Sequence, residues 1–144
     1  MMSREVRMME RDTGSAGGAA WKDTGLVLIV DDLEGVRMVV ARSVERFGFD
    51  TCEASNGAEA IALFESNPAG FRVAIIDLKM PVMDGMELAR RLRSLRPDFP
   101  ILLMSGFNHN QALVEINPAV PMGFLHKPFT LSDLRRELRS TLGA

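Results

Sequence analysis

The chain lacks the features that mark several large classes of protein. Its single cysteine, Cys52, excludes an internal disulfide and fits a reducing compartment. No apolar run approaches the ~20 residues of a membrane-spanning helix, and the charged N-terminus lacks the apolar segment of a secretory signal. The net charge of −2 argues against a general nucleic-acid binder, because a surface that follows phosphates is usually basic. We therefore expect a cytoplasmic protein that contacts neither membrane nor nucleic acid directly.

Composition and length instead predict one globular domain behind a polar leader. The 144 residues are 47% hydrophobic and 25% charged, which is ordinary for a globular domain. Residues 1–24 contain few branched apolar residues and a Gly/Ala/Ser stretch at 14–20, so we expect a flexible leader there. Residues 25–144 are expected to form the folded domain.

Short apolar runs alternate with helical patterns from residue 26 onward. Runs with the length and apolar pattern of strands occupy residues 26–30, 49–54, 73–77, 101–105 and 123–127. Apolar residues at helical spacing, with Gly48, Asn56 and Asp84 as end signals, predict helices over 36–47, 56–66, 84–95 and 131–142. The predicted fold class is α/β: a doubly wound, flavodoxin-like sheet of five parallel strands in the order 2-1-3-4-5, with helices on both faces.

Polar residues stand where these apolar strands end. In such sheets, ligands bind beyond the carboxyl ends of the strands, at the point where the strand order reverses. Neighbouring strands lie about 4.8 Å apart, so the order 2-1-3-4-5 brings three carboxylates into one pocket, with a hydroxyl and an ammonium on its rim. The residues that we expect to meet there are Asp31, Asp32, Asp77, Ser105 and Lys127.

This combination of side chains predicts phosphoryl transfer. Carboxylates so close together repel one another unless a cation joins them. An open site with only oxygen ligands suits Mg²⁺, which keeps several waters and pairs with phosphate. Lys127 supplies a second positive charge for a phosphoryl group, and a carboxylate beside a metal and a lysine can attack phosphorus to give an acyl phosphate. Residue types alone therefore suggest that an aspartate accepts a phosphoryl group.

Four motifs in order carry a family resemblance. They are "VLIVDD" (27–32), "VAIIDLKMPVMDG" (73–85), "ILLMSG" (101–106) and "FLHKPF" (124–129). At this spacing the sequence resembles the receiver domain of two-component response regulators over about residues 25–143. "LLMSGF" and "HKPFTLSDL" are also similar to receivers fused to hybrid histidine kinases.

The resemblance implies a role for each acidic residue of the predicted pocket. Asp77 would be the phosphoacceptor. Asp32 would be a direct Mg²⁺ ligand, Asp31 would bind the ion largely through water, and Lys79 would contribute its backbone carbonyl.

The resemblance also implies how the phosphoryl group would be bound and sensed. Lys127 would contact it, and Ser105 would hydrogen-bond it and report its presence. Phe124 falls at the family's switch aromatic, although a Phe in the fifth strand would also pack in the core without that role. The Lys127–Pro128 bond would be cis. The face of the fifth strand that carries His126 is expected to point away from the site.

Taken as a whole, the likeness implies a phosphoacceptor receiver of a two-component phosphorelay that signals by conformational switching. The phosphoryl group would come from a histidine kinase or phosphotransfer protein. The chain would catalyse only its own phosphorylation and dephosphorylation, with no separate substrate turnover. The downstream protein target stays unknown, and a homodimer stays open.

One segment departs from the family pattern, and the chain length leaves two interpretations. Asn117–Pro118 and Pro121 predict that the fourth helix ends early, which leaves the output surface undefined. The chain stops at Ala144 with no output domain after it, so we expect either a stand-alone receiver or a module of a longer chain.

Two other functional classes share parts of this pattern, a flavodoxin-like electron carrier and a phosphatase with an aspartate nucleophile. A flavodoxin-like electron carrier needs a first loop rich in Ser, Thr and Gly to hold a phosphate, whereas "VDDLEGVR" offers two acids. A hydrolase similar to the haloacid-dehalogenase phosphatases needs an acid two residues after the nucleophile, where this chain has Lys79. Both patterns favour the receiver.

Overall fold

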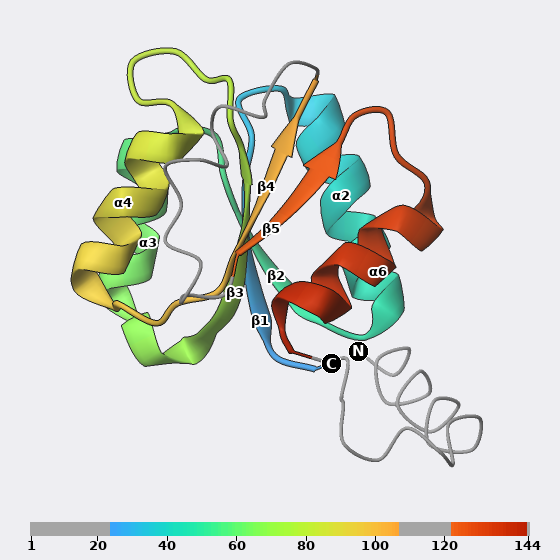
Figure 1. The fold of residues 1–144 in the computed structure, drawn as a ribbon. Coiled ribbons are helices and arrows are strands. Elements are labelled where there is room, and N and C mark those ends of the chain that lie inside the picture. The colour runs from blue at the N-terminus through green and yellow to red at the C-terminus, as the bar shows by residue number, and fades with distance from the viewer. Residues whose placement is uncertain (1–23, 107–121, 144) are drawn as a thin grey trace.

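A single parallel sheet organises the computed structural model, which describes residues 24–106 and 122–143. The strands lie in the order β2-β1-β3-β4-β5, as predicted (Figure 1). Their bounds are β1 Leu26–Val30, β2 Asp50–Ala54, β3 Phe71–Asp77, β4 Ile101–Ser105 and β5 Met122–His126. Every neighbouring pair is parallel, which confirms the α/β class.

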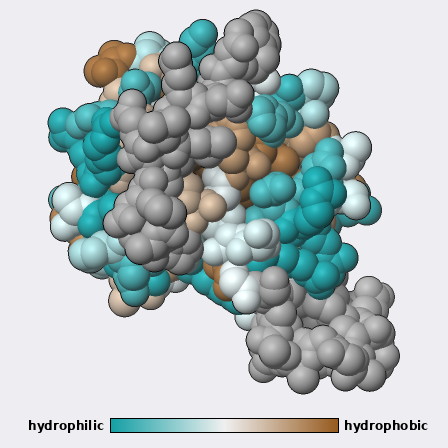
Figure 2. Space-filling view, in the orientation of Figure 1, coloured by the Kyte–Doolittle hydropathy of each residue, from teal (hydrophilic) through white to brown (hydrophobic). Residues whose placement is uncertain are grey.

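Helices cover both faces of this sheet (Figure 1). One face carries α2 (Glu34–Phe47) and α6 (Leu131–Thr141), and the other carries α3 (Gly57–Ser66) and α4 (Gly85–Leu95). A 3₁₀ turn at Pro68–Gly70 leads into β3. Figure 2 shows that the outer surface of α6 is hydrophilic, as expected for a helix that buries only one stripe. Among the described residues, no helix combines the length and apolar character needed to cross a membrane.

Successive strand residues contribute to two separate cores. Val27, Ile29, Val73 and Ile75 pack with the side chains of α2 and α6. Leu28, Val30, Ala74 and Ile76 pack with those of α3 and α4. Because successive side chains of a strand point to opposite faces, this division follows from continuous apolar runs such as "LVLIV". It also fixes the face on which the next residue of each strand lies.

Several predicted helix ends are confirmed by their hydrogen bonds. The Asn56 side chain accepts from the Glu59 N–H at 2.8 Å, and Asp84 Oδ1 accepts from the Glu87 N–H at 2.9 Å. Gly48 ends α2 in the left-handed conformation, with φ of 118°, which an L side chain rarely adopts.

Three residues of the predicted apolar stripes are exposed instead of buried. Val39, Leu95 and Leu131 have exposed fractions of 62%, 45% and 43%. Val39 lies one position before Val40, a rotation of about 100° around α2, and this rotation carries it off the buried face. Leu95 and Leu131 are the last residue of α4 and the first of α6, where the helix leaves its contact with the sheet.

Some strand bounds differ from the predictions, and two predictions fall on residues that the structure does not describe. β3 begins two residues earlier than expected, at Phe71, and β5 runs from Met122 to His126, so Lys127 follows the strand instead of ending it. The leader and the early end of the fourth helix at Asn117–Pro118 lie outside the described residues.

Candidate functional site

The polar residues predicted at the strand ends come together at the carboxyl edge of the sheet. The β1–β3 ladder ends at Val30 and Ile76, so the next residues, Asp31 and Asp77, lie side by side. Carboxylate oxygens of Asp31, Asp32 and Asp77 all lie within 4.8 Å of one another. The three-acid cluster that the sequence predicts is therefore present in the structure.

Asp31 is completely buried at this edge. Its Oδ1 accepts a hydrogen bond from the Leu33 N–H at 2.9 Å, which orients the carboxylate in the turn before α2. Its Oδ2 has no hydrogen-bond partner among the described residues and lies 3.6 Å from Lys127 Nζ. A buried carboxylate oxygen without a hydrogen bond is costly, so this atom is available for an incoming cation or its water.

Asp77 is 4% exposed, and its Oδ1 accepts a hydrogen bond from Lys127 Nζ at 3.0 Å. Burial is the largest influence on the carboxyl and raises its pKa above the ordinary value. The Lys127 ammonium acts in the opposite direction, whereas the neighbouring carboxylates of Asp31 and Asp32 raise the pKa further. The ionised form of Asp77 is therefore under-stabilised in the pocket, and a bound cation would favour it.

Ser105 lies at the end of β4, with 1% of its surface exposed. Its carbonyl accepts from the Lys127 N–H at 2.7 Å, which fixes the start of the β5–α6 connection beside it. Its Oγ has no hydrogen-bond partner among the described residues. A buried hydroxyl of this kind can donate to an oxygen that enters the pocket.

The loop after Asp77 is tied closely to the sheet. The Leu78 N–H donates to the Met104 carbonyl at 2.9 Å, and the Gly85 N–H donates to the Leu78 carbonyl at 2.9 Å. A Cβ on Gly85 would lie 2.4 Å from the Asp77 carbonyl oxygen, so this close approach requires glycine. The sequence predicts no role for Gly85, although the Asp84–Gly85 pair at the start of a helix is a visible signal.

Two of the residues near the rim of the site have exposed side chains, and a third, Phe124, is half-buried. The side chain of Lys79 is exposed, as is His126, whose ring centroid lies 4.7 Å from that of Phe124 in an edge-on contact. Phe124 is half-buried and packs partly against the core beneath α3 and α4. The Lys127–Pro128 peptide bond is cis, as the resemblance implied.

A second basic side chain, Arg37, contacts the acidic site without having been predicted from the sequence. Arg37 of α2 donates from Nη1 to the Asp31 carbonyl at 2.8 Å and pairs through Nε with Glu53 Oε1 at 3.0 Å. No motif considered in the sequence marks it, since one Arg among several on a helix surface carries no local signature. Its contacts become visible only once β1, β2 and α2 are placed together.

Comparison with known proteins identifies the family. The model of the response regulator receiver domain matches residues 27–139. The sensor kinase CckA of Brucella abortus (strain 2308) is 31% identical over 141 residues, which cover 98% of this chain and 14% of that kinase. The receiver protein CpdR of the same strain is 34% identical over 120 residues, which cover 81% of this chain and 95% of CpdR.

Solved structures give the same answer for the fold. The Vibrio cholerae chemotaxis protein CheY4 superposes with a TM-score of 0.75 at 31% identity, over 83% of this chain and 99% of that one. The receiver domain of the hybrid histidine kinase CckA superposes with a TM-score of 0.67 at 27% identity, over 82% and 99% of the two chains.

The relatives differ greatly in length. This chain spans about one seventh of the CckA kinase but nearly all of CpdR. Receivers of this kind typically take part in phosphorelay from histidine kinases and bind Mg²⁺ at an acidic site. The match to the family model covers most of the chain, and the protein therefore belongs to the response regulator receiver domains of two-component signalling systems.

Proposed function

We propose that this receiver accepts a phosphoryl group on Asp77 from the phosphohistidine of a histidine kinase or phosphotransfer protein. One observation carries the proposal. Asp77 is held against Lys127 Nζ at 3.0 Å, inside a cluster of three carboxylates, and burial, followed by the charges of the neighbouring acids, raises its pKa. A structural aspartate would gain from one cation and no neighbouring acids, whereas a phosphoacceptor needs a carboxylate among groups that bind a phosphoryl dianion and a metal.

The reaction proceeds by displacement at phosphorus. A carboxylate oxygen of Asp77 forms the new O–P bond as the P–N bond to the donor imidazole breaks, and the electron pair of that bond stays on the imidazole nitrogen. Lys127 then exchanges its hydrogen bond to the free carboxylate for one to a phosphoryl oxygen. The buried Oγ of Ser105 donates to another phosphoryl oxygen and so gains the partner that it lacks among the described residues.

The acidic cluster fits a hard divalent cation. Asp31, Asp32, Asp77 and the main-chain carbonyl of Lys79 would hold Mg²⁺, which prefers oxygen ligands and retains several waters. When bound, the ion neutralises charge on the phosphoryl oxygens. The Oδ2 of buried Asp31 supports this assignment, because it has no hydrogen bond among the described residues and only a 3.6 Å approach to Lys127 Nζ, which is costly for a carboxylate oxygen that folding has removed from water.

Signalling would follow from the new charge on Asp77. A phosphoryl group shifts a conformational equilibrium only if one state binds it better, and Ser105 with Lys127 would supply that difference. Phe124, half-buried on β5, would respond as the switch aromatic and alter the surface that a downstream protein contacts. The domain at 25–144, behind a leader at 1–24, would act in the cytoplasm with no separate substrate turnover.

Labelling with a small phosphodonor tests the proposal. We expect acetyl phosphate with Mg²⁺ to add one phosphoryl group to the wild-type protein, as read by intact mass, and none to Asp77→Asn. Asp98→Asn is the matched control, because the Asp98 side chain is 86% exposed and lies outside the cluster. Undiminished labelling of Asp77→Asn would show that another residue accepts the group.

A further inference from the structure

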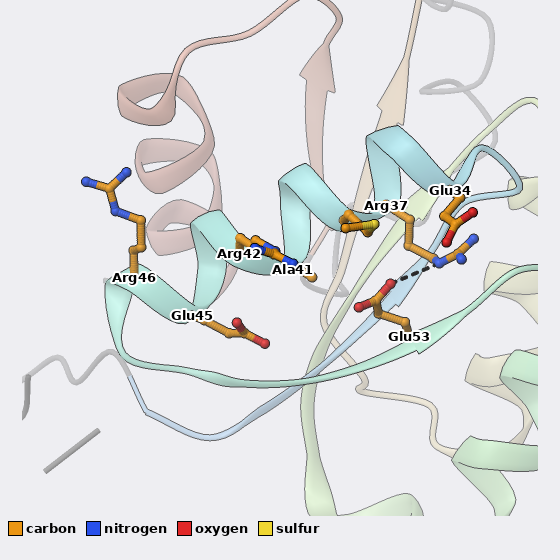
Figure 3. Close-up of a pocket in the computed structure, with 8 residues that line it drawn as sticks. Glu34, Arg37, Ala41, Arg42, Glu45, Arg46 and Glu53 are labelled. Atoms are coloured by element: carbon orange, nitrogen blue, oxygen red, sulfur yellow. Dashed lines mark hydrogen bonds and ion pairs between the residues drawn. The ribbon is translucent and has the colours of Figure 1, made fainter. Parts of the chain in front are cut away.

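Arg37 links helix α2 to the acidic pocket. Figure 3 shows its side chain reaching from α2 toward Glu53 of β2, and 15% of the Arg37 side chain is exposed. Its Nε lies 3.0 Å from Glu53 Oε1, while its Nη1 donates to the Asp31 carbonyl oxygen at 2.8 Å. The guanidinium therefore joins a β2 side chain to the main chain of an acid in the three-carboxylate cluster.

Asp31 needs such an anchor because it lies past the end of its strand. The ladders of β1 with both neighbours end at Val30, so Asp31 is the first residue without a ladder partner of its own. Its N–H donates to the Ala54 carbonyl at 3.2 Å, and its Oδ1 accepts from the Leu33 N–H at 2.9 Å. Arg37 binds the remaining main-chain group, the carbonyl, and so completes the set of contacts that fix this peptide.

The two contacts of Arg37 depend on the shape of its side chain. A guanidinium is planar and presents its N–H groups in a rigid fork, so Arg37 can donate to the Asp31 carbonyl through one branch while its Nε pairs with Glu53. A lysine ammonium would offer a single point of charge on a flexible stem. Arginine at this position thus supplies orientation as well as charge.

We propose that Arg37 is a positioning residue of the acidic site, which holds the main chain of Asp31 so that its carboxylate faces Asp77 and Lys127. The proposal rests on the proposed function, in which Asp31 helps to hold Mg²⁺. Groups that orient metal ligands from behind typically change metal affinity by about 10-fold or more when they are removed. Arg37 acts through the peptide of Asp31 and touches neither the phosphoryl group nor the ion.

The competing explanation is that Arg37 only fastens α2 to β2 through its ion pair with Glu53. Glu53→Ala removes that ion pair but leaves the Asp31 carbonyl contact possible, so it is the matched control. A fastening role predicts equal effects of Arg37→Ala and Glu53→Ala. A positioning role predicts a much larger effect of Arg37→Ala on the acidic site, because Glu53→Ala leaves the hydrogen bond to the Asp31 carbonyl possible.

Calorimetric titration with MgCl₂ separates the two explanations. We expect the Mg²⁺ dissociation constant to rise about 10-fold in Arg37→Ala and about 2-fold or less in Glu53→Ala. In an Asp31→Ala background, Arg37→Ala should cause no further loss, because the carboxylate that it positions is gone. If Arg37→Ala does not fold, Arg37→Lys replaces it in the same comparison.

A metal-free measurement provides a second readout. Hydrogen exchange of the Leu33 amide, which donates to Asp31 Oδ1, should accelerate in Arg37→Ala with EDTA present and stay near the wild-type rate in Glu53→Ala. Equal Mg²⁺ affinities and equal exchange rates in the two variants would overturn the positioning role. Absence of Mg²⁺ binding by the wild-type protein would instead count against the proposed function, so the two failures are distinguishable.

Discussion

The two ends of the sheet differ in whether their polar groups have hydrogen-bond partners among the described residues. At the end where the strands begin, arginines bind main-chain carbonyls. Arg96 Nη1 donates to the Phe71 carbonyl at 2.5 Å and the Pro68 carbonyl at 3.1 Å, and Arg93 Nε donates to the Phe99 carbonyl at 3.1 Å. The Arg96 guanidinium also lies 4.9 Å from the centre of the Phe99 ring. These contacts join loops to the core and stabilise the fold.

At the carboxyl end of the strands, polar groups are crowded together and some lack hydrogen bonds among the described residues. Three carboxylates crowd together, and the buried atoms Asp31 Oδ2 and Ser105 Oγ lack hydrogen-bond partners among the described residues. Both of these atoms lie at the carboxyl end of the sheet. A site that gives up local stability in this way is typical of binding and catalysis, because the missing partners are the ligands themselves.

The largest expected effect is the loss of stability when Arg96, at the end where the strands begin, is replaced. Arg96→Ala removes hydrogen bonds to two carbonyls and a contact with an aromatic ring, so we expect a loss of about 2 kcal/mol in the free energy of unfolding. Urea denaturation measures it. Arg91→Ala is the control, since Arg91 is 56% exposed and forms a surface ion pair with Glu87 one turn earlier on α4. Equal midpoints for wild type and Arg96→Ala would contradict the contrast between the two ends.

Adding Mg²⁺ should relieve the repulsion among the three carboxylates at the carboxyl end of the sheet. If the dissociation constant is roughly millimolar, 10 mM Mg²⁺ should stabilise the protein by about 1.4 kcal/mol, or on the order of 3 to 5 °C in Tm. Asp32→Asn should lose most of this response, since it removes an exposed carboxylate of the cluster. Thermal melts in EDTA and in MgCl₂ measure the shift, with KCl as a control for screening. A full response in Asp32→Asn would place the ion elsewhere.

The smallest expected effect is the difference in stability between Asp77→Asn and the wild-type protein in metal-free buffer. Its raised pKa means that ionisation is less favourable in the folded than in the unfolded state, so stability present below the unfolded pKa of about 3.9 is lost as pH rises through the folded pKa. Asp77→Asn cannot ionise, and in EDTA it should be about 1 kcal/mol more stable than wild type near neutral pH.

That advantage should shrink as the pH falls through the raised folded pKa, because the wild-type carboxyl then becomes protonated in the folded state, and it should vanish below the unfolded pKa of about 3.9, where the carboxyl is protonated in both states. Urea unfolding of both proteins at several pH values measures the difference. Asp98→Asn should show no comparable trend, because its carboxyl is exposed. A constant or inverted difference between wild type and Asp77→Asn would mean that burial and the neighbouring acids do not control this carboxyl.

The strands, the strand order and the acidic cluster were accessible from the sequence for a physical reason. Buried parallel strands must be continuously apolar, so an acid directly after such a run, as at Asp31 and Asp77, is conspicuous. Parallel strands also end at a common edge, which lets separate positions be combined into one site without knowing any side-chain contact.

Other features could not be predicted because they depend on distances between elements. The two contacts of the Arg37 guanidinium depend on how α2 lies against β2. The requirement for Gly85 depends on how closely α4 approaches the end of β3. The exposure of Val39 depends on which stripe of α2 meets the sheet. Periodicity gives the width of an apolar stripe but not the rotation of its helix to within one residue.

Because alternate residues of a strand pack in different cores, the number of residues between the core positions of β3 and Asp77 sets the side to which Asp77 points. Val73, Ile75 and Asp77 lie on one side of β3, and Ala74 and Ile76 lie on the other. Inserting one residue within this run would exchange the two sets and turn Asp77 toward the side of α3 and α4, away from Asp31 and Lys127. Inserting two would restore its side but move it beyond their reach. The even-numbered spacing from the buried Val73 to Asp77 is thus as much a part of the site as the carboxylate itself.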